Sequence, residues 1–199
     1  MNANRFMLYR KACRGCRSML AIVALLAYVS SGAAQENIDP MADTITPWFS
    51  MIEQSFISLA DAMPAEKYDF KPTNGAFENA RTFGEQVKHV ACANFAFFNQ
   101  IEQKEPPAGC ASGGPSTAET KEELMVYLRE SFAYAQRVLR TMTAANALEP
   151  AGGPYGGQST RLGLATLAVW HASDHYGQLV VYLRMNGIIP PASRPTRSQ

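Results

Sequence analysis

Four segments of the chain carry apolar residues at intervals of three and four, the spacing that lines one face of an α-helix. The first segment begins at an N-cap, Asp39 or Thr46, each followed by proline, and stops at Pro64. Its apolar positions are Met41, Ile45, Trp48, Phe49, Ile52, Phe56, Leu59 and Met63. Residues 65–81 lack this pattern and contain proline and glycine, so they predict a long connection.

The second and third segments each open with a capping box, a Thr followed three residues later by Glu. The second helix is expected from Thr82 to about Glu102, and the third from Thr120 to near Ala145. The second has its main apolar stripe at Phe83, Val87, Val90, Asn94, Phe98 and Ile101. The third has its stripe at Leu124, Tyr127, Leu128, Phe132, Ala135, Val138, Leu139 and Met142.

The fourth helix follows a glycine-rich link, is capped by Ser159 or Thr160, and ends at Gly187 ahead of Pro190. One of its apolar faces carries Leu164, Leu167, Ala168, His171, His175, Gln178 and Tyr182, and the other carries Val169, Tyr176, Val180 and Leu183. A helix that is apolar on both sides is central in its bundle or shared with a second subunit, which leaves a homodimer open. Four such helices without an alternating strand pattern predict an all-α four-helix bundle.

The N-terminus has the pattern of a cleavable signal peptide. Five Lys and Arg residues precede or flank the start of an apolar run at 19–29, and small residues follow at 30–34. The run is short for a membrane span, and no cysteine follows it to accept a lipid. We therefore expect cleavage of residues 1–34 near Ala34 and an exported protein, periplasmic or secreted, without a stable membrane anchor after cleavage. An uncleaved N-terminal anchor is the alternative.

Cleavage would change the charge of the chain. The signal segment holds five of the 18 Lys and Arg and no acid, which leaves 13 cations against 17 Asp and Glu. This mildly acidic chain has no basic patch interleaved with aromatic residues, so we expect no nucleic-acid partner. The length that remains suits one domain, expected at 35–192, followed by a mobile tail at 193–199.

The chain has four cysteines in two groups. Cys13 and Cys16 form a C-x-x-C inside the predicted signal peptide and would be removed with it. Cys92 and Cys110 remain, and an even pair in an exported chain predicts a disulfide. The alternative is that Cys92, three residues after His89, binds a metal.

The three histidines of the chain are the candidate chemistry. His171 and His175 are four residues apart, so on a helix they project from one face and can bind one metal ion. The H-E-x-x-H pattern of zinc metalloproteases is absent, because Ala172 stands where the glutamate would be. Two polar residues on an ordinary buried helix are the alternative. His89 lies off the centre of its apolar stripe, so the pattern alone places it at a flank.

Two longer motifs resemble the DinB-like family. They are T-F-G-E-Q-V-K-H, ending at His89, and W-H-A-S-D-H-Y-G-Q-L-V-V-Y-L-R-M-N-G-I-I-P-P, with Phe70-Lys71-Pro72 ahead of them. The resemblance implies a four-helix bundle that holds a divalent metal through three histidines, here His89, His171 and His175. Many relatives carry a further histidine where this chain has Asp174.

Three imidazole ligands favour a divalent transition metal over calcium or magnesium, with zinc or nickel as first choices and iron or manganese as alternatives. Three protein ligands leave a position for water or substrate, as in catalytic sites. Because relatives include thiol-dependent transferases, isomerases and proteins labelled hydrolases, the resemblance implies a metal-dependent hydrolase or transferase of an unidentified small molecule. A non-enzymatic metal-binding or stress-associated module is the alternative. Asp174, Glu85 and Tyr182 are candidates to contact the ligands, and no catalytic residue is readable.

Overall fold

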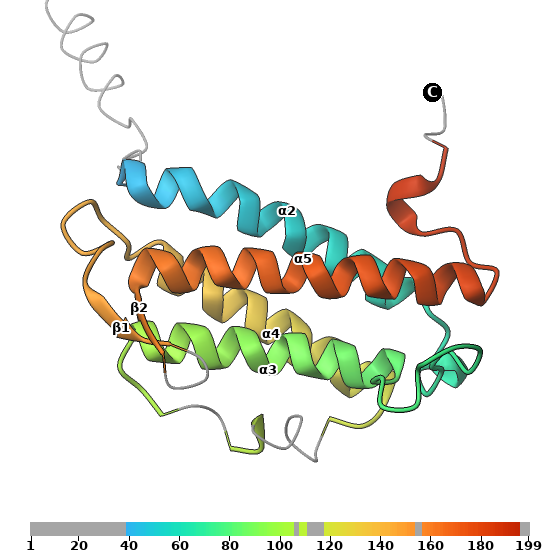
Figure 1. The fold of residues 1–199 in the computed structure, drawn as a ribbon. Helices are drawn as coiled ribbons and strands as arrows, with labels where there is room; N and C mark the ends of the chain where they lie inside the picture. The colour runs from blue at the N-terminus through green and yellow to red at the C-terminus, as the bar shows by residue number, and fades with distance from the viewer. Residues whose placement is uncertain (1–38, 106–107, 111–117, 154–156, 196–199) are drawn as a thin grey trace, which may run out of the picture. The chain divides into compact units, whose positions relative to one another are not determined.

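The computed structural model describes residues 39–105, 108–110, 118–153 and 157–195. Within these ranges four long helices form a bundle (Figure 1), as the apolar pattern predicts: α2 (Pro40–Ala62), α3 (Phe83–Ile101), α4 (Lys121–Leu139) and α5 (Arg161–Met185). No helix in these ranges has the length and apolar character needed to cross a bilayer. The expected signal peptide, residues 1–34, lies outside the described residues.

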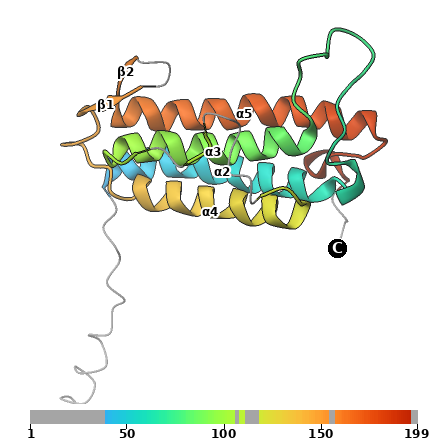
Figure 2. The same cartoon turned by 90° about the horizontal axis from the view of Figure 1, so that it is seen from below.

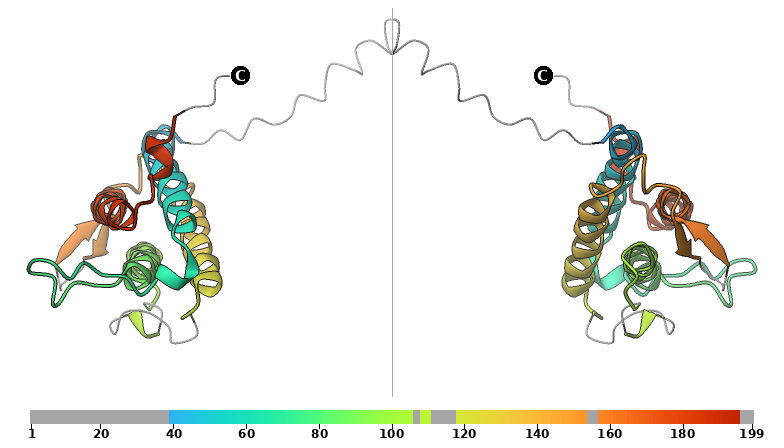
Figure 3. Two further views of the ribbon diagram at one scale, coloured as in Figure 1. Left: turned by 90° about the vertical axis from the view of Figure 1, so that its right-hand side faces the viewer. Right: turned by 90° about the vertical axis from the view of Figure 1, so that its left-hand side faces the viewer.

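Helix α3 packs against α4 and α5, and α2 packs against the same two helices from the other side. Viewed along the bundle, α3 and α5 lie on one side and α2 and α4 on the other (Figure 3). The directions do not alternate along the chain: α2 and α5 run one way, and α3 and α4 run the other (Figure 2). The start of α5 therefore lies at the end of α3, where Arg161 Nη1 donates to the carbonyl of Ile101 at 3.2 Å.

Aromatic side chains fill the centre of the bundle. The ring of Phe49 on α2 lies 5.5 Å from that of Phe98 on α3 and 5.4 Å from that of Phe132 on α4. All three are fully buried, as their stripes predict. Trp48 is 59% exposed although it falls on the predicted stripe of α2. The apolar stripe predicted for α2 is therefore wider than the face of α2 that the other helices cover.

The helix starts follow the capping signals. Asp39 caps α2, and its Oδ1 accepts from the Met41 N–H at 2.9 Å, so the helix continues through Pro47 and does not begin there. At α3 the Thr82 hydroxyl accepts from the Glu85 N–H at 3.2 Å, and the Glu85 carboxylate accepts from the Thr82 N–H at 2.7 Å. The predicted capping box of α4 is also present.

Helix α4 ends at Leu139, so the expected end near Ala145 was wrong. Thr143 and Asn146 bond each other's backbone N–H groups through their side chains, at 2.8 and 3.3 Å. Such side-chain bonds offer the backbone an alternative to the helix. Met142 remains buried beyond the helix end, which explains why the apolar pattern ran on.

The glycine-rich link between α4 and α5 holds a two-stranded hairpin, β1 (Pro150–Gly152) and β2 (Gln158–Thr160), which the sequence did not predict. The strands are antiparallel, with Pro150 opposite Thr160. The pairing provides hydrogen-bond partners for backbone N–H and C=O groups of the link. Thr160 then caps α5, accepting from the Gly163 N–H at 3.0 Å. The helix ends as predicted, with Gly187 at φ 71°.

Three shorter features complete the described chain. Cys92 and Cys110 form the predicted disulfide, with their Cα atoms 5.5 Å apart, and it ties α3 to the connection that leads to α4. Short 3-10 helices stand at η1 (Ala65–Lys67) and η4 (Pro191–Ser193). Of the expected tail 193–199, Ser193 belongs to η4, and residues 196–199 lie outside the described ranges.

Candidate metal centre

Three histidine rings meet between α3 and α5. His89 comes from α3, and His171 and His175 come from successive turns of α5. Candidate ligand nitrogens of the three rings all lie within 4.8 Å of one another, and the ring centroids are 4.7 to 5.0 Å apart. The structure thus brings together all three residues that the sequence singled out, as a group that can hold a metal ion.

The spacing of the nitrogens fits a metal. Nε2 of His89 lies 3.1 Å from Nε2 of His171. Two imidazole nitrogens bound tetrahedrally to zinc at 2.0–2.1 Å would be about 3.4 Å apart. In addition, Nδ1 of His171 is buried and has no hydrogen-bond partner among the described residues. The close pair of Nε2 atoms is compatible with a metal-binding donor set, and Nδ1 of His171 is an alternative donor of the same ring.

The three imidazoles are held in the neutral form that binds metals. Burial is the largest cause: it lowers the pKa of His89 to about 4 and that of His171 to about 3. The Arg81 cation and the neighbouring histidines contribute the smaller part of both pKa shifts. The pKa of His175 is also lowered by burial, with the Asp174 charge opposing the shift. At neutral pH the site would therefore bind a metal without first losing protons.

Gln86 orients one of the rings. Its side chain is 2% exposed, and Oε1 lies 2.9 Å from Nδ1 of His175. With Nδ1–H donating to this oxygen, Nε2 of His175 keeps its lone pair free for a metal. The sequence analysis missed Gln86, although a polar residue one turn before the stripe position Val90 was a readable signal.

An aromatic wall stands beside the rings. Phe97 on α3 meets His171 edge-on, with centroids 5.5 Å apart and planes at 90°. Phe97 is buried, and so is Ala172, at the position where a zinc protease has its glutamate. Neither of these two side chains can transfer a proton.

The other three candidates do not hydrogen-bond the rings. Asp174 is exposed and accepts from Gln178 Nε2 at 2.9 Å. Glu85 is committed to the capping box of α3. Tyr182 donates its hydroxyl to the Arg81 carbonyl at 3.1 Å. Asp174 acts on the rings through its charge, which opposes the lowering of the His175 pKa.

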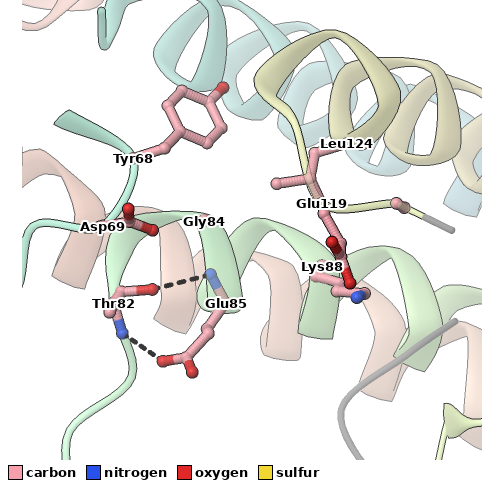
Figure 4. Close-up of a pocket in the computed structure, with 9 residues that line it drawn as sticks. Tyr68, Asp69, Thr82, Gly84, Glu85, Lys88, Glu119 and Leu124 are labelled. Atoms are coloured by element: carbon pink, nitrogen blue, oxygen red, sulfur yellow. Dashed lines mark hydrogen bonds between the residues drawn. The ribbon is translucent and has the colours of Figure 1, made fainter. Parts of the chain in front are cut away.

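Two hollows of the described surface lie elsewhere. A cavity of about 160 Å³ at the start of α3 is lined by Tyr68, Thr82, Lys88, Glu119 and their neighbours (Figure 4). Another, of about 300 Å³, lies in the connection 71–78. No histidine lines either of them. The centre is therefore defined by contacts between α3 and α5 and not by these hollows.

Comparison with solved structures finds DinB-like proteins. One from Bacillus subtilis has a TM-score of 0.58 at 22% identity, covering 78% of this chain and 98% of its own. Another, from Bacillus cereus, has a TM-score of 0.62 at 15% identity, covering 75% of this chain and 95% of its own. At these identities the likeness establishes the fold alone. Comparison with curated proteins finds no match.

The family assignment comes from the sequence match. The family model for the DinB superfamily matches residues 49–179, about two thirds of the chain. That range includes His89, His171 and His175, and it extends from α2 into α5. The chain therefore belongs to the DinB superfamily.

Proposed function

We propose that this chain binds one divalent transition metal through His89, His171 and His175. The observation that carries the proposal is the convergence of three neutral imidazoles, with candidate nitrogens within 4.8 Å of one another. Imidazole nitrogens suit zinc and nickel, and they also bind iron and manganese. The contact between Gln86 and His175 supports the same assignment, because a metal-binding histidine ordinarily donates its other nitrogen to such a partner.

We further propose that the bound metal serves a hydrolase or transferase reaction of a small molecule. Within the described residues no carboxylate or thiol joins the three rings, so three protein ligands leave a coordination position for water or substrate. A metal in such a site polarises a bound oxygen and lowers the pKa of a bound water. The protein supplies orientation through Gln86 and an apolar wall through Phe97.

The proposal includes export. A cationic start, an apolar run and small residues at 30–34 support cleavage near Ala34. The disulfide between Cys92 and Cys110 supports an oxidising compartment, because such bonds are rare in the cytosol.

A non-enzymatic metal-binding module is the second candidate. It is favoured by the lack of an acid, base or nucleophile in hydrogen-bond contact with the rings among the described residues, where Gln86 is the polar side chain that touches them. Asp174, the nearest candidate base, is bonded to Gln178 instead.

Cobalt substitution separates these candidates. If a position on the metal is open, azide, cyanide or a thiol should change the visible spectrum of the cobalt protein. Turnover in ester, amide and phosphoester panels, lost in His171→Ala, would then establish catalysis. A spectrum indifferent to all three probes, with no turnover, would favour the module. Absence of any metal after purification without a histidine tag and after cobalt loading would overturn the metal site itself.

A further inference from the structure

Arg81 is a cation that the proposed function leaves without a role. It stands immediately before Thr82, the N-cap of α3, and its side chain is exposed. Its backbone is anchored to α5, because the Tyr182 hydroxyl donates to the Arg81 carbonyl at 3.1 Å. The ring of Tyr182 is held in turn by an edge contact with Phe70, with centroids 5.7 Å apart.

Arg81 lies on the same seam as the histidines. Three contacts join α5 with α3 and the residue before its N-cap, in order along the two antiparallel segments: Arg81 with Tyr182, Gln86 with His175, and His89 with His171. Arg81 and Tyr182 form the last step of this series, about two helical turns from His89. The arginine therefore stands at one end of the row of contacts along which the rings are arranged.

The charge of Arg81 reaches all three rings. Its guanidinium contributes to the lowered pKa of His89, of His171 and of His175. These effects agree with the backbone contact that holds Arg81 beside α5 at one end of the row of histidine contacts. The order of contacts therefore places Arg81 where its side chain can extend along α5 towards a molecule held at the rings.

No acidic side chain neutralises Arg81 within the described ranges. The ion pairs found there join Lys104 with Glu102 and Lys121 with Asp61. Glu85, one turn along α3, gives its carboxylate to the Thr82 N–H. A guanidinium without a counter-charge, near three neutral ligands, creates a positive field.

We infer that Arg81 recognises an oxyanion, a carboxylate or phosphate group, on the molecule that occupies the centre formed by His89, His171 and His175. This inference rests on the proposed function, because a metal would hold the reacting end of that molecule. Guanidinium binds both kinds of oxyanion through two parallel N–H bonds. A divalent metal with three neutral ligands keeps its full charge, so the metal and Arg81 would attract anions together.

Anion titration of the cobalt-substituted protein tests the inference. The probes are inorganic phosphate and acetate, with imidazole as a neutral probe that binds the metal alone. In Arg81→Gln the dissociation constants of both anions should rise about tenfold or more at low salt, while that of imidazole and the metal content stay unchanged. Arg81→Lys should recover part of the affinity, since it restores the charge without the planar fork. A larger effect on one of the two anions identifies the preferred group.

Lys88→Gln is the matched control. It removes a cation from α3, the helix that Arg81 precedes, but Lys88 lines the cavity beside Glu119 and not the histidine centre (Figure 4). Its anion affinities should equal those of the unmodified protein. If Arg81→Gln binds the anions as tightly as the unmodified protein, or if Lys88→Gln loses as much affinity as Arg81→Gln, the role of Arg81 is overturned. A spectral response to azide in the same samples would still support the metal site. Failure of the unmodified protein to bind cobalt would overturn the proposed function and this inference with it.

Discussion

Oε1 of Gln86 lies 2.9 Å from Nδ1 of His175, although 89 residues separate the two in the chain. The contact determines which nitrogen of the ring is free: Nδ1 is engaged, so Nε2 keeps the lone pair that a metal can bind. Because both side chains are buried, the pair is shielded from water that could replace either partner. The orientation of His175 is therefore set before any metal binds.

Gln86→Leu should lower metal affinity by about 10- to 100-fold, the loss typical of removing a partner that orients a metal-binding histidine. Competition with a chromogenic chelator measures it. Gln86→Glu keeps an acceptor oxygen and should retain most of the affinity. Asn94→Leu is the matched control, since Asn94 is a buried amide on the same helix that donates to Ser131 at 3.3 Å and not to a ring. Equal affinity in Gln86→Leu and Asn94→Leu would argue against the orienting role.

Each of His89→Ala, His171→Ala and His175→Ala should weaken metal binding by more than about 100-fold, because each removes a ligand and not merely its partner. Elemental analysis after dialysis measures occupancy, and helical circular dichroism shows whether the bundle remains folded. Full occupancy in folded His89→Ala would exclude a site that spans α3 and α5.

The metal-free protein should lose stability as the pH falls from about 6.5 towards 3. In this window unfolded histidines take up protons at their ordinary pKa of about 6.5. The folded rings resist, since burial lowers the pKa of His89 to about 4 and that of His171 to about 3. The unfolded state then binds more protons, and the free energy of unfolding decreases with falling pH. Above pH 6.5 the rings are neutral in both states and contribute no slope.

Urea unfolding at several pH values gives the slope. It should reach up to about 1.4 kcal/mol per pH unit for each such histidine. His171→Asn removes one of these groups and should flatten the curve, while carboxylate titration is common to both proteins. Parallel curves would mean that His171 takes up its proton in the folded protein as readily as in the unfolded one.

Removal of the disulfide by Cys92→Ser with Cys110→Ser should lower the free energy of unfolding by roughly 3 kcal/mol, since the bond closes a loop of 18 residues. Metal content should not change, because neither sulfur belongs to the histidine group. Non-reducing peptide mapping of the unmodified protein checks the bond. Free thiols there, with metal lost in Cys92→Ser, would restore Cys92 as a ligand.

Protein purified from its native host should lack residues 1–34. Signal peptidases cut after small residues that follow an apolar run, as at Ala33 and Ala34. Intact-mass measurement distinguishes the cleaved chain from the full one. A mass that includes Met1 to Ala34 would contradict soluble export and favour an N-terminal anchor.

The local parts of this fold were predictable, because their causes lie within a few residues. The capping boxes at Thr82 and Thr120 combine a Thr with a Glu three positions later, so they could be identified without tertiary information. The ends of α3 and α5 followed in the same way. The hairpin at 150–160 was not predicted, because its two strands are three residues long and carry no alternation of apolar and polar residues.

The centre was predictable in part. The positions of His171 and His175 on one helix face follow from their spacing, but the inward position of His89 did not follow from its place beside the apolar stripe. That flank becomes an inner position because α5 packs on this side of α3. The roles assigned to Gln86 and Arg81 depend on residues of α5 that are 89 and 101 positions away. Periodicity within one helix carries no information about such partners.

The position of α4 between α3 and α5 in the chain also has a kinetic consequence. His89 and His171 are 82 residues apart, and a complete helix that supplies no ring must be synthesised and placed between them. Contacts of such long sequence separation form late. Closing the long segment costs conformational entropy, and the favourable energy of the contact is gained only after closure. During refolding, helical structure should therefore return before the ability to capture a metal ion. Capture would then report that assembly is complete, and metal added to the unfolded chain would not nucleate it.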